Sequence, residues 1–342
     1  MQIWSVRRLG RQERKEKKHM ESKMPRTVSA VSVVEASHLT KDYGYGRGVF
    51  DVSIHVDEGE VFGFLGPNGA GKSTTIRHLM GFSKPDSGST RIFGFDTFSK
   101  YDKVLSKIGY IPGEIALPAG LTGWQFIRMM QDMQGIHNKE QLDAMLSLFE
   151  LADNVLQGET KRMSLGVKRK LAIVTAFMAD PSVLILDEPT SGLDPVMQEN
   201  FIRFIHEEKA RGKTILLSSH IFSEIDSTCD RIAIIKDGHI VSEFVADELK
   251  HASRKYYTVV FENERARHDF VEGSAALSSF ALLSEDAAKN SVYLSIEDAE
   301  LNELIALLSS LEVRSFSNRK ETLEDYFMKF YKEERDFGGA LK

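Results

Sequence analysis

Short apolar runs separated by turn-forming residues dominate the hydrophobic pattern of this chain. Residues 182–188 and 214–220 are nearly continuous apolar runs that end in polar side chains, which is typical of strands buried on both faces of a parallel sheet. Residues 61–65 form another short buried run, residues 52–56 alternate like a half-buried strand, and residues 31–35 predict an opening strand. The pattern predicts an α/β fold with a β-rich layer ahead of its core.

A helical periodicity sets the middle of the chain apart from the strands on either side. Thr122 and Gln125 fit a capping box at the start of a helix. Four apolar side chains then follow at helical spacing: Phe126, Met129, Met130 and Met133. We therefore expect an all-helical insertion over residues 115–163, in which the methionine stripe belongs to the core or forms an adaptable docking face.

The last part of the chain, residues 251–342, predicts a small C-terminal α+β domain. Residues 256–261 and 291–296 have the composition of strands. Two helix faces follow, each made of four apolar side chains: Leu301, Leu304, Ile305 and Leu308 in the first, and Leu323, Tyr326, Phe327 and Phe330 in the second. We find no pattern there that indicates chemistry.

Composition limits the class of protein. The 342 residues suffice for two domains, and the apolar content of 42% and charged content of 27% are ordinary for a soluble globular protein. No stretch approaches the ~18 apolar residues that a membrane-spanning helix needs. Cys229 is the only cysteine, which excludes a disulfide framework and a thiol-based metal site and favours a reducing, cytosolic setting.

The net charge of −6 is unevenly distributed along the chain. Residues 1–26 carry nine Lys and Arg against three Asp and Glu, so residues 1–29 form a basic leader without the apolar region of a signal peptide. One hypothesis is an arm that touches anionic lipid or nucleic acid. The other, which we favour, is a disordered tail upstream of a true start at Met20 or Met24.

A glycine-rich loop at residues 66–74 fits the phosphate-binding pattern G-x-x-x-x-G-K-[ST]. It follows the predicted strand 61–65 and opens a predicted helix at residues 73–80. Backbone N–H groups and the helix N-terminus would together hold a polyphosphate. Lys72 would reach the β- and γ-phosphates and the Ser73 hydroxyl would ligate Mg²⁺. The loop therefore predicts binding of a nucleoside triphosphate.

Two of the buried strands end in side chains that suit hydrolysis of that nucleotide. Asp187 and Glu188 end the run at 182–188, and ligands bind at the carboxyl ends of such strands. Asp187 would meet Mg²⁺, directly or through water, and Glu188 would orient or deprotonate the attacking water. His220 ends the run at 214–220, where it could contact the γ-phosphate and hold the water–glutamate geometry.

Together these motifs resemble the ATP-binding cassette (ABC) ATPases over residues 31–245, within a predicted domain of residues 30–250. The resemblance implies a P-loop ABC ATPase domain with a β-rich nucleotide-base subdomain, a RecA-like core and a helical insertion. Tyr43 matches the aromatic residue that stacks on adenine, and Asp194 lies in the D-loop. The phosphate-binding residues would be Gly66, Asn68, Gly69, Ala70, Gly71, Lys72, Ser73 and Thr74.

The most diagnostic segment of the resemblance is residues 163–167, which lie where the family has its Leu-Ser-Gly-Gly-Gln signature. Ser164 and Gly166 are kept, and the Ser-Leu-Gly form is similar to the branch that serves type-2 exporters. Ser164 can cap the following helix, whose N-terminus can face a phosphate. In the family the signature caps the nucleotide of the opposite subunit, so the resemblance implies a head-to-tail dimer with Asp194 at its seam.

One residue departs from the family pattern. The family usually places a glutamine after the strand that ends here at residues 110–112, and it touches Mg²⁺ and couples to the membrane partner. This chain has Gly113 followed by Glu114. Glu114 is either a replacement ligand for the metal or water, or an ordinary loop acid.

The resulting hypothesis is an ATPase subunit that uses ATP and Mg²⁺ to drive a separate polytopic permease, as an exporter at the cytoplasmic face of the membrane. It would dimerise with a second ATPase subunit, identical or not. The alternatives are a non-transport ABC ATPase acting on nucleic acid or ribosomes, and a regulatory module that binds ATP without useful hydrolysis. A single P-loop without sustained heptads argues against the first alternative, and Asp187, Glu188 and His220 argue against the second.

Overall fold

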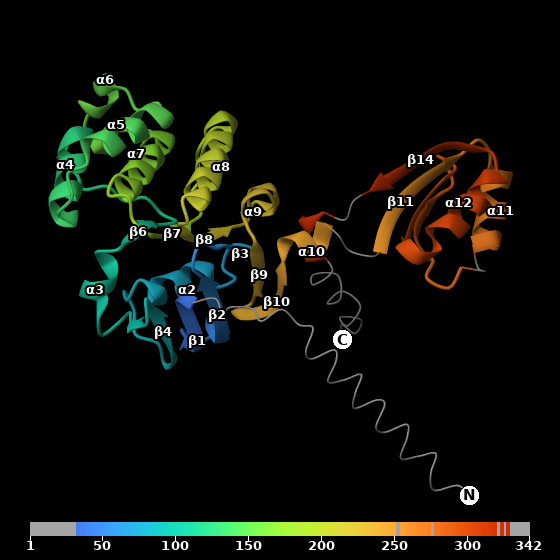
Figure 1. Ribbon diagram of the computed structural model, residues 1–342, viewed down its shortest axis with the longest axis horizontal. Helices are drawn as coiled ribbons and strands as arrows, with labels where there is room; N and C mark the ends of the chain where they lie inside the picture. The colour runs from blue at the N-terminus through green and yellow to red at the C-terminus, as the bar shows by residue number, and fades with distance from the viewer. Residues whose placement is uncertain (1–31, 251–253, 275–276, 320–321, 325, 329–342) are drawn as a thin grey trace, which may run out of the picture.

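The computed structural model describes residues 32–250, 254–274, 277–319, 322–324 and 326–328 (Figure 1). The basic leader and Phe330 lie outside the described residues. In the described part of the chain the strands form two sheets in the first 250 residues and a third sheet after them. The predicted α/β class is therefore confirmed, and the predicted strands lie in these sheets.

The first sheet is antiparallel, in the order β2-β1-β4-β5. Its strands are β1 (Ser32–Asp42), β2 (Gly48–Asp57), β4 (Ser87–Ile92) and β5 (Phe95–Asp96). The opening strand is longer than the sequence predicted because its pairing with β2 continues as far as Asp42 and Gly48. This sheet is the predicted β-rich layer.

The second sheet has six strands in the order β10-β9-β3-β8-β7-β6. They are β3 (Val61–Leu65), β6 (Ile108–Ile111), β7 (Val183–Asp187), β8 (Thr214–Ser219), β9 (Arg231–Lys236) and β10 (His239–Val245). All neighbours are parallel except β9 and β10, which form a hairpin. Every residue of β3, β7 and β8 is buried, because both faces of the sheet are covered.

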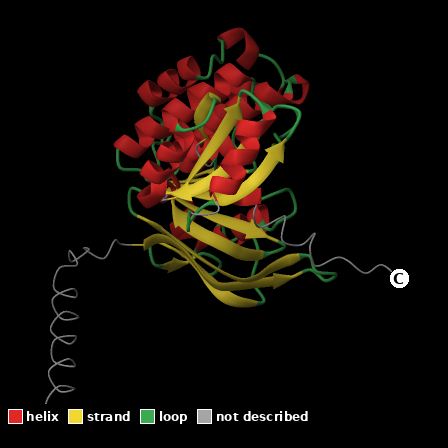
Figure 2. Ribbon diagram, turned by 90° about the vertical axis from the view of Figure 1, so that its right-hand side faces the viewer, coloured by secondary structure: helices red, strands yellow, loops and turns green. Residues whose placement is uncertain are grey.

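Two apolar cores cover the two faces of this sheet. One lies against the antiparallel sheet and includes α2 (Lys72–Leu79), with α3 (Tyr101–Leu105) at its margin. The other face carries α7 (Leu165–Phe177), α8 (Pro195–Ala210) and α9 (Phe222–Thr228). Figure 1 shows these helices above the row of β6, β7 and β8, with α2 and β1 below it, and Figure 2 shows the same layers from the side.

The predicted helical insertion consists of α4 (Gly123–Gln134), α5 (Lys139–Leu148), α6 (Asp153–Leu156) and the 3₁₀ turn η1 (Thr160–Arg162). The predicted capping box is present, since the Thr122 hydroxyl accepts the Gln125 N–H at 3.2 Å and the Gln125 side chain accepts the Thr122 N–H at 2.8 Å. The stripe on α4 divides: Phe126 is buried, whereas Met133 is 74% exposed.

The third sheet follows α10 (Ala246–Lys250) and has the order β12-β13-β11-β14. Its elements are β11 (Arg254–Phe261), α11 (Glu264–Ser274), β12 (Ala281–Asp286), β13 (Ser291–Glu297), η2 (Asp298–Glu300), α12 (Leu301–Ser309) and β14 (Val313–Arg319). This β-α-β-β-α-β order is that of ferredoxin-like domains. The sequence predicted β11, β13 and α12, but Ile305 is 48% exposed and does not belong to the core face of α12.

The last described stretch, residues 322–324 and 326–328, is called the tail segment here. Its Leu323 and Phe327 pack into the core that covers α9, not into the core of the third sheet. The Phe327 ring lies 5.0 Å from that of Phe222 on α9, and the Tyr326 ring lies 4.8 Å from that of Phe244 on β10. Figure 1 shows this stretch, in red, next to α10. The chain therefore returns to the core it left at residue 250.

The contacts of the tail segment predict that it stabilises the first 250 residues. We expect Phe327→Ala to lower the free energy of unfolding by about 3 kcal/mol, the usual cost of deleting a buried ring. Met328→Ala is the matched control, because that side chain is 40% exposed and its loss should cost less than ~0.5 kcal/mol. Urea unfolding measures both, and equal effects of the two substitutions would contradict the assignment.

Candidate active site

The phosphate-binding loop connects β3 to α2, where its glycines adopt conformations that other residues avoid. Gly69 and Gly71 have φ angles of 85° and 115°, in the left-handed region that favours glycine. A Cβ at Gly71 would also lie 2.7 Å from the Val49 side chain. The loop therefore requires glycine at residue 71, both for its backbone and for its packing under β2. The α2 N-terminus that follows it is a ready site for an anion.

Lys72 bridges the loop and the end of β7. Its ammonium donates to the carbonyls of Gly66 at 2.5 Å and Pro67 at 3.3 Å. The same nitrogen lies 3.0 Å from Oε1 of Glu188. Only 5% of the Lys72 side chain is exposed, so this cation and the Glu188 carboxylate are held together out of water. A phosphate placed on the loop would compete with Glu188 for the ammonium.

The acids at the end of β7 are held by the neighbouring strand β8. The Ser218 hydroxyl donates to Oδ1 of Asp187 at 2.5 Å, and the Ser218 carbonyl accepts the Glu188 N–H at 3.0 Å. Glu188 has a φ of 49°, a left-handed conformation that costs free energy in a residue other than glycine. His220 Nδ1 lies 2.6 Å from Oε2 of Glu188. The two ends of the Glu188 carboxylate are thus bound by a lysine and a histidine.

Two adjoining cavities bring most of the predicted site residues together. The smaller, of 130 Å³, lies over the loop and is lined by Pro67, Asn68, Gly69, Gly71, Lys72, Ser73, Thr74 and Glu188. The larger, of 590 Å³, shares Asn68, Ser73 and Glu188 with it and adds Asp187, His220 and Glu114 among its lining residues. Gly66 and Ala70 complete the loop behind these surfaces.

The oxygen donors of the larger cavity fit a hard divalent cation. The Ser73 hydroxyl and the carboxylates of Asp187 and Glu114 line it, and Mg²⁺ prefers oxygen ligands of this kind, usually one or two carboxylates together with substrate phosphates. Glu114 is therefore within the same cavity as Asp187. Gly113 comes closer still, since a Cβ there would lie 3.0 Å from Oδ2 of Asp187. A glutamine at this position would require a shift of the loop or of Asp187.

Four predicted nucleotide contacts are absent from the lining of either cavity: Tyr43, Ser164, Gly166 and Asp194. Ser164 is exposed and caps α7, with its hydroxyl accepting the Val167 N–H at 3.3 Å. The Asp194 carboxylate caps α8. Tyr43 is 54% exposed, with the Lys41 ammonium 5.8 Å from its ring centre. Within one copy of the chain, none of these four residues lines the two cavities at the phosphate-binding loop.

Several residues that line the larger cavity were not singled out by the sequence, among them Arg77, Phe82 and Tyr110. The rings of Phe82 and Tyr110 meet edge to face at 5.7 Å. Burial raises the pKa of Tyr110 to about 12, and the negative charge of Asp187 adds to the effect. Tyr110 is therefore a neutral hydroxyl in this cavity. Its place in the predicted strand that ends at residues 110–112 was the only available signal.

A buried carboxyl, Glu224 on α9, lies behind His220. The Ser219 hydroxyl donates to its Oε2 at 2.6 Å. Burial raises the pKa of Glu224 to about 7, hydrogen bonds from Ser219 and Thr190 act in the opposite direction, and the charge of Glu188 raises it further. This acid links the end of β8 to the segment that follows Glu188.

Fold and site together define a P-loop ATPase of the cassette type. The family model described as ABC transporter matches residues 49–191. The chain is 35% identical over 303 residues to the bacitracin transport ATP-binding protein BcrA of Bacillus licheniformis, covering 87% of this chain and 97% of that protein. It is 32% identical over 301 residues to the daunorubicin/doxorubicin resistance ATP-binding protein DrrA of Streptomyces peucetius, covering 86% of this chain and 91% of that protein.

Solved structures agree with this likeness. An ATP-binding subunit of an ABC transporter superimposes with a TM-score of 0.59 at 31% identity, over 64% of this chain and 92% of that one. The dimeric cassette MJ0796 bound to ADP and Pi has the same fold, with a TM-score of 0.57 at 24% identity over 62% of this chain and 98% of that one. The chain belongs to the ATP-binding subunits of ABC transporters, binds ATP and hydrolyses it.

The raised pKa of Glu224 predicts a pH-dependent stability. Because the folded-state pKa of Glu224 lies above the ordinary value of 4.5, the protonated acid stabilises the fold. This stabilisation is present at acid pH and is lost as the pH rises through about 7. Glu224→Gln has no acid to ionise at this position and should not lose stability in this way. Between about pH 5 and pH 8 the variant should gain about 3 kcal/mol of stability relative to the wild type.

Unfolding by urea at these two pH values measures the effect. Glu207→Gln on the outer face of α8 is the control, since Glu207 is exposed. The assignment would be wrong if the wild type and Glu224→Gln lost stability in parallel as the pH rose.

Proposed function

We propose that the chain drives export through a separate transmembrane permease, working as a head-to-tail dimer that encloses two nucleotides. The observation that carries this proposal is the position of Ser164, which is exposed at the N-terminus of α7 and outside the lining of both cavities. A helix N-terminus suits a phosphate, and a second ATPase subunit, identical or not, would bring one to it. The names of the bacitracin and daunorubicin relatives support export.

In this proposal the P-loop backbone and Lys72 hold the β- and γ-phosphates. Lys72 leaves Glu188 as the γ-phosphate takes its place, because the ammonium lies 3.0 Å from that carboxylate and phosphate oxygens compete for it. Glu188 is then free to accept a proton from the attacking water. His220, 2.6 Å from the other oxygen of Glu188, fixes the direction of that carboxylate and can contact the γ-phosphate.

Mg²⁺ would be held by Ser73 and Asp187, with Glu114 as a further donor, and would neutralise charge on the phosphates. Ser218 keeps the Asp187 carboxylate in place through its hydrogen bond of 2.5 Å. Tyr43 would stack on the adenine, because an exposed ring accepts a purine face. Ser164, Gly166 and Asp194 would complete the site of the other subunit. Gly166 packs against the D-loop backbone, where a Cβ would lie 3.0 Å from the Gly192 carbonyl.

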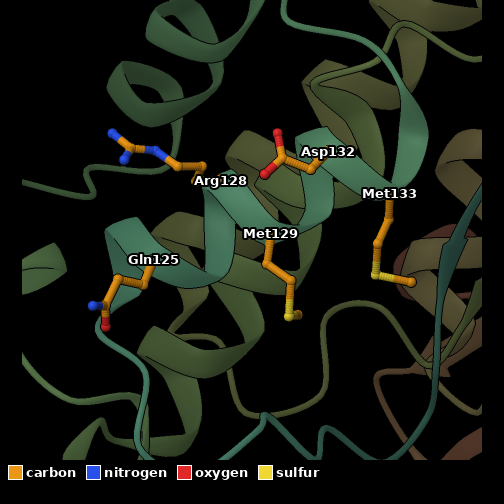
Figure 3. Close-up of a pocket in the computed structure, with 5 residues that line it drawn as sticks. All are labelled: Gln125, Arg128, Met129, Asp132 and Met133. Atoms are coloured by element: carbon orange, nitrogen blue, oxygen red, sulfur yellow. The ribbon is translucent and has the colours of Figure 1, made fainter.

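We propose that the permease docks on a shallow cavity along α4 (Figure 3). This cavity of 460 Å³ is lined by Gln125, Arg128, Met129, Asp132 and Met133. Met129 and Met133 extend toward the bottom of the view, whereas Asp132 points upward. Methionine adapts to irregular partner surfaces, and Met129 and Met133 place two apolar side chains along the same cavity.

Such docking would place the chain at the cytoplasmic face of the membrane, bound through the permease. Among the residues that the structure describes, every helix is too short or too polar to span a membrane. The alternative role on nucleic acid or ribosomes has support only from the basic leader, which lies outside the described residues.

Glu188→Gln tests the proposed function. We expect ATP turnover to fall about 100-fold or more, because the general base is lost, while the nucleotide still binds. The variant should form a stable dimer with ATP and capture a polytopic membrane protein from detergent-solubilised membranes. Glu207→Gln, which changes an exposed acid on α8, should hydrolyse ATP normally. Unchanged turnover, or capture of nucleic acid instead of a membrane protein, would sink the proposal.

The docking surface has a separate test. Met133→Asp should reduce capture of the permease about 10-fold, since it places a charge on an apolar contact, and should leave ATP turnover of the free protein within about twofold of the wild type. Ile305→Asp on α12 is the control, because Ile305 is also a large exposed apolar residue. Equal capture by both variants would exclude α4 as the docking site.

A further inference from the structure

Arg169 is a buried cation on the signature helix α7. Only 2% of the residue is exposed, and it is the largest fully buried side chain among the residues that the structure describes. Arginine is almost never buried in this way without partners. The residue lies in the second turn of α7, after the cap formed by Ser164.

The guanidinium of Arg169 binds two loops that are far apart in the sequence. Nη1 donates to the Pro112 carbonyl at 2.9 Å and Nη2 to the Gly113 carbonyl at 2.7 Å. Nε donates to the Ser191 carbonyl at 3.0 Å. The rigid fork of a guanidinium fixes the relative position of all three acceptors. One side chain therefore connects α7, the loop after β6 and the loop after β7.

Each of the two loops contacts one of the acids. Gly113 packs on Asp187, since a Cβ there would lie 3.0 Å from Oδ2. Ser191 closes the turn after Glu188, with its N–H donating to the Glu188 carbonyl at 3.2 Å. Burial lowers the pKa of Arg169, and the charges of Asp187 and Glu188 raise it again. The cation and the two acids are thus electrostatically linked, although the hydrogen bonds of Arg169 go to the backbone.

We propose that Arg169 is a positioning residue for hydrolysis, which sets the loop that contacts Asp187 and the loop that follows Glu188 according to the position of α7. In this chain Arg169 couples α7 to the loop at Gly113, the residue that stands where the family has a glutamine. When Ser164 at the start of α7 binds a nucleotide, a movement of α7 is transmitted through Arg169 to the carbonyls of both loops at the same time. That last step rests on the proposed dimer, whereas the positioning of the acids does not.

The three hydrogen bonds alone are also consistent with a side chain that only satisfies buried carbonyls. The two roles differ in what substitution changes. Loss of packing would lower stability and weaken nucleotide binding together with turnover. Loss of positioning would lower kcat while ATP binding to the phosphate loop stays the same, because Arg169 directs its hydrogen bonds to residues 112, 113 and 191 and not to residues 66–74.

The experiment compares Arg169→Gln and Arg169→Lys in the full chain. Arg169→Gln should lower kcat about 30-fold or more, since small misplacements of catalytic groups have effects of this size. The Kd for a fluorescent ATP analogue should stay within about threefold of the wild type. Arg169→Lys keeps the charge without the fork and should fold normally, with kcat reduced about fivefold.

Lys170→Gln is the matched control, because it removes the neighbouring positive charge on the same helix and should leave kcat and Kd unchanged. The proposal is overturned if a folded Arg169→Gln keeps kcat within about threefold of the wild type. It is also overturned if kcat and analogue binding fall in parallel. If Arg169→Gln does not fold, Arg169→Lys decides, and an unchanged kcat in that variant overturns the proposal.

A second measurement tests the role of Arg169 and the proposed dimer independently of each other. In the Glu188→Gln background, ATP should drive dimerisation of the single variant, and the double variant with Arg169→Gln should need about 10-fold more ATP. A single variant that stays monomeric would refute the proposed dimer, while the kcat and Kd comparison would still decide the role of Arg169. Equal ATP dependence of the single and double variants would overturn the coupling to α7.

Discussion

The active site depends on three buried parallel strands that end at the same edge of one sheet. β3, β7 and β8 are neighbours in register, with Leu65 beside Ser219 and Asp187 beside Ser218. Burial on both faces fixes that register, because a slip would break the packing of every side chain. The phosphate loop, the acid pair and His220 each begin where one of these strands stops. Their mutual distances are therefore set by the sheet before any of their own contacts form.

The site then adds contacts that hold Glu188 in a costly conformation. Its left-handed backbone is enclosed by the Ser218 carbonyl on one side and the turn to Ser191 on the other. Lys72 and His220 bind the two oxygens of its carboxylate. Such strain persists only where the surroundings over-determine the geometry. Glu188 is thus held through both its backbone and its carboxylate.

The sequence predicted much of this arrangement because local patterns determine it. The continuous apolar runs located β3, β7 and β8, the glycine spacing located the phosphate loop, and Thr122 and Gln125 located the start of α4. What it could not predict depends on contacts between distant segments. Arg169 looked like an ordinary charge on a helix, and only the folded chain shows its three carbonyl partners. Phe82 and Glu224 are likewise ordinary in sequence, and the helix face predicted at Leu323 and Phe327 packs on α9.

The chain enters and leaves the third sheet at neighbouring positions. Tyr256 near the start of β11 pairs with Arg319 at the end of β14, and the tail segment then packs on α9 and β10. Topologically the ferredoxin-like unit is an inserted module whose two ends lie on adjacent strands. Close ends let a module be exchanged or removed without stretching its host. A lineage could replace this unit while the ATPase core, tail included, stays intact, provided that the new module also presents its two ends side by side.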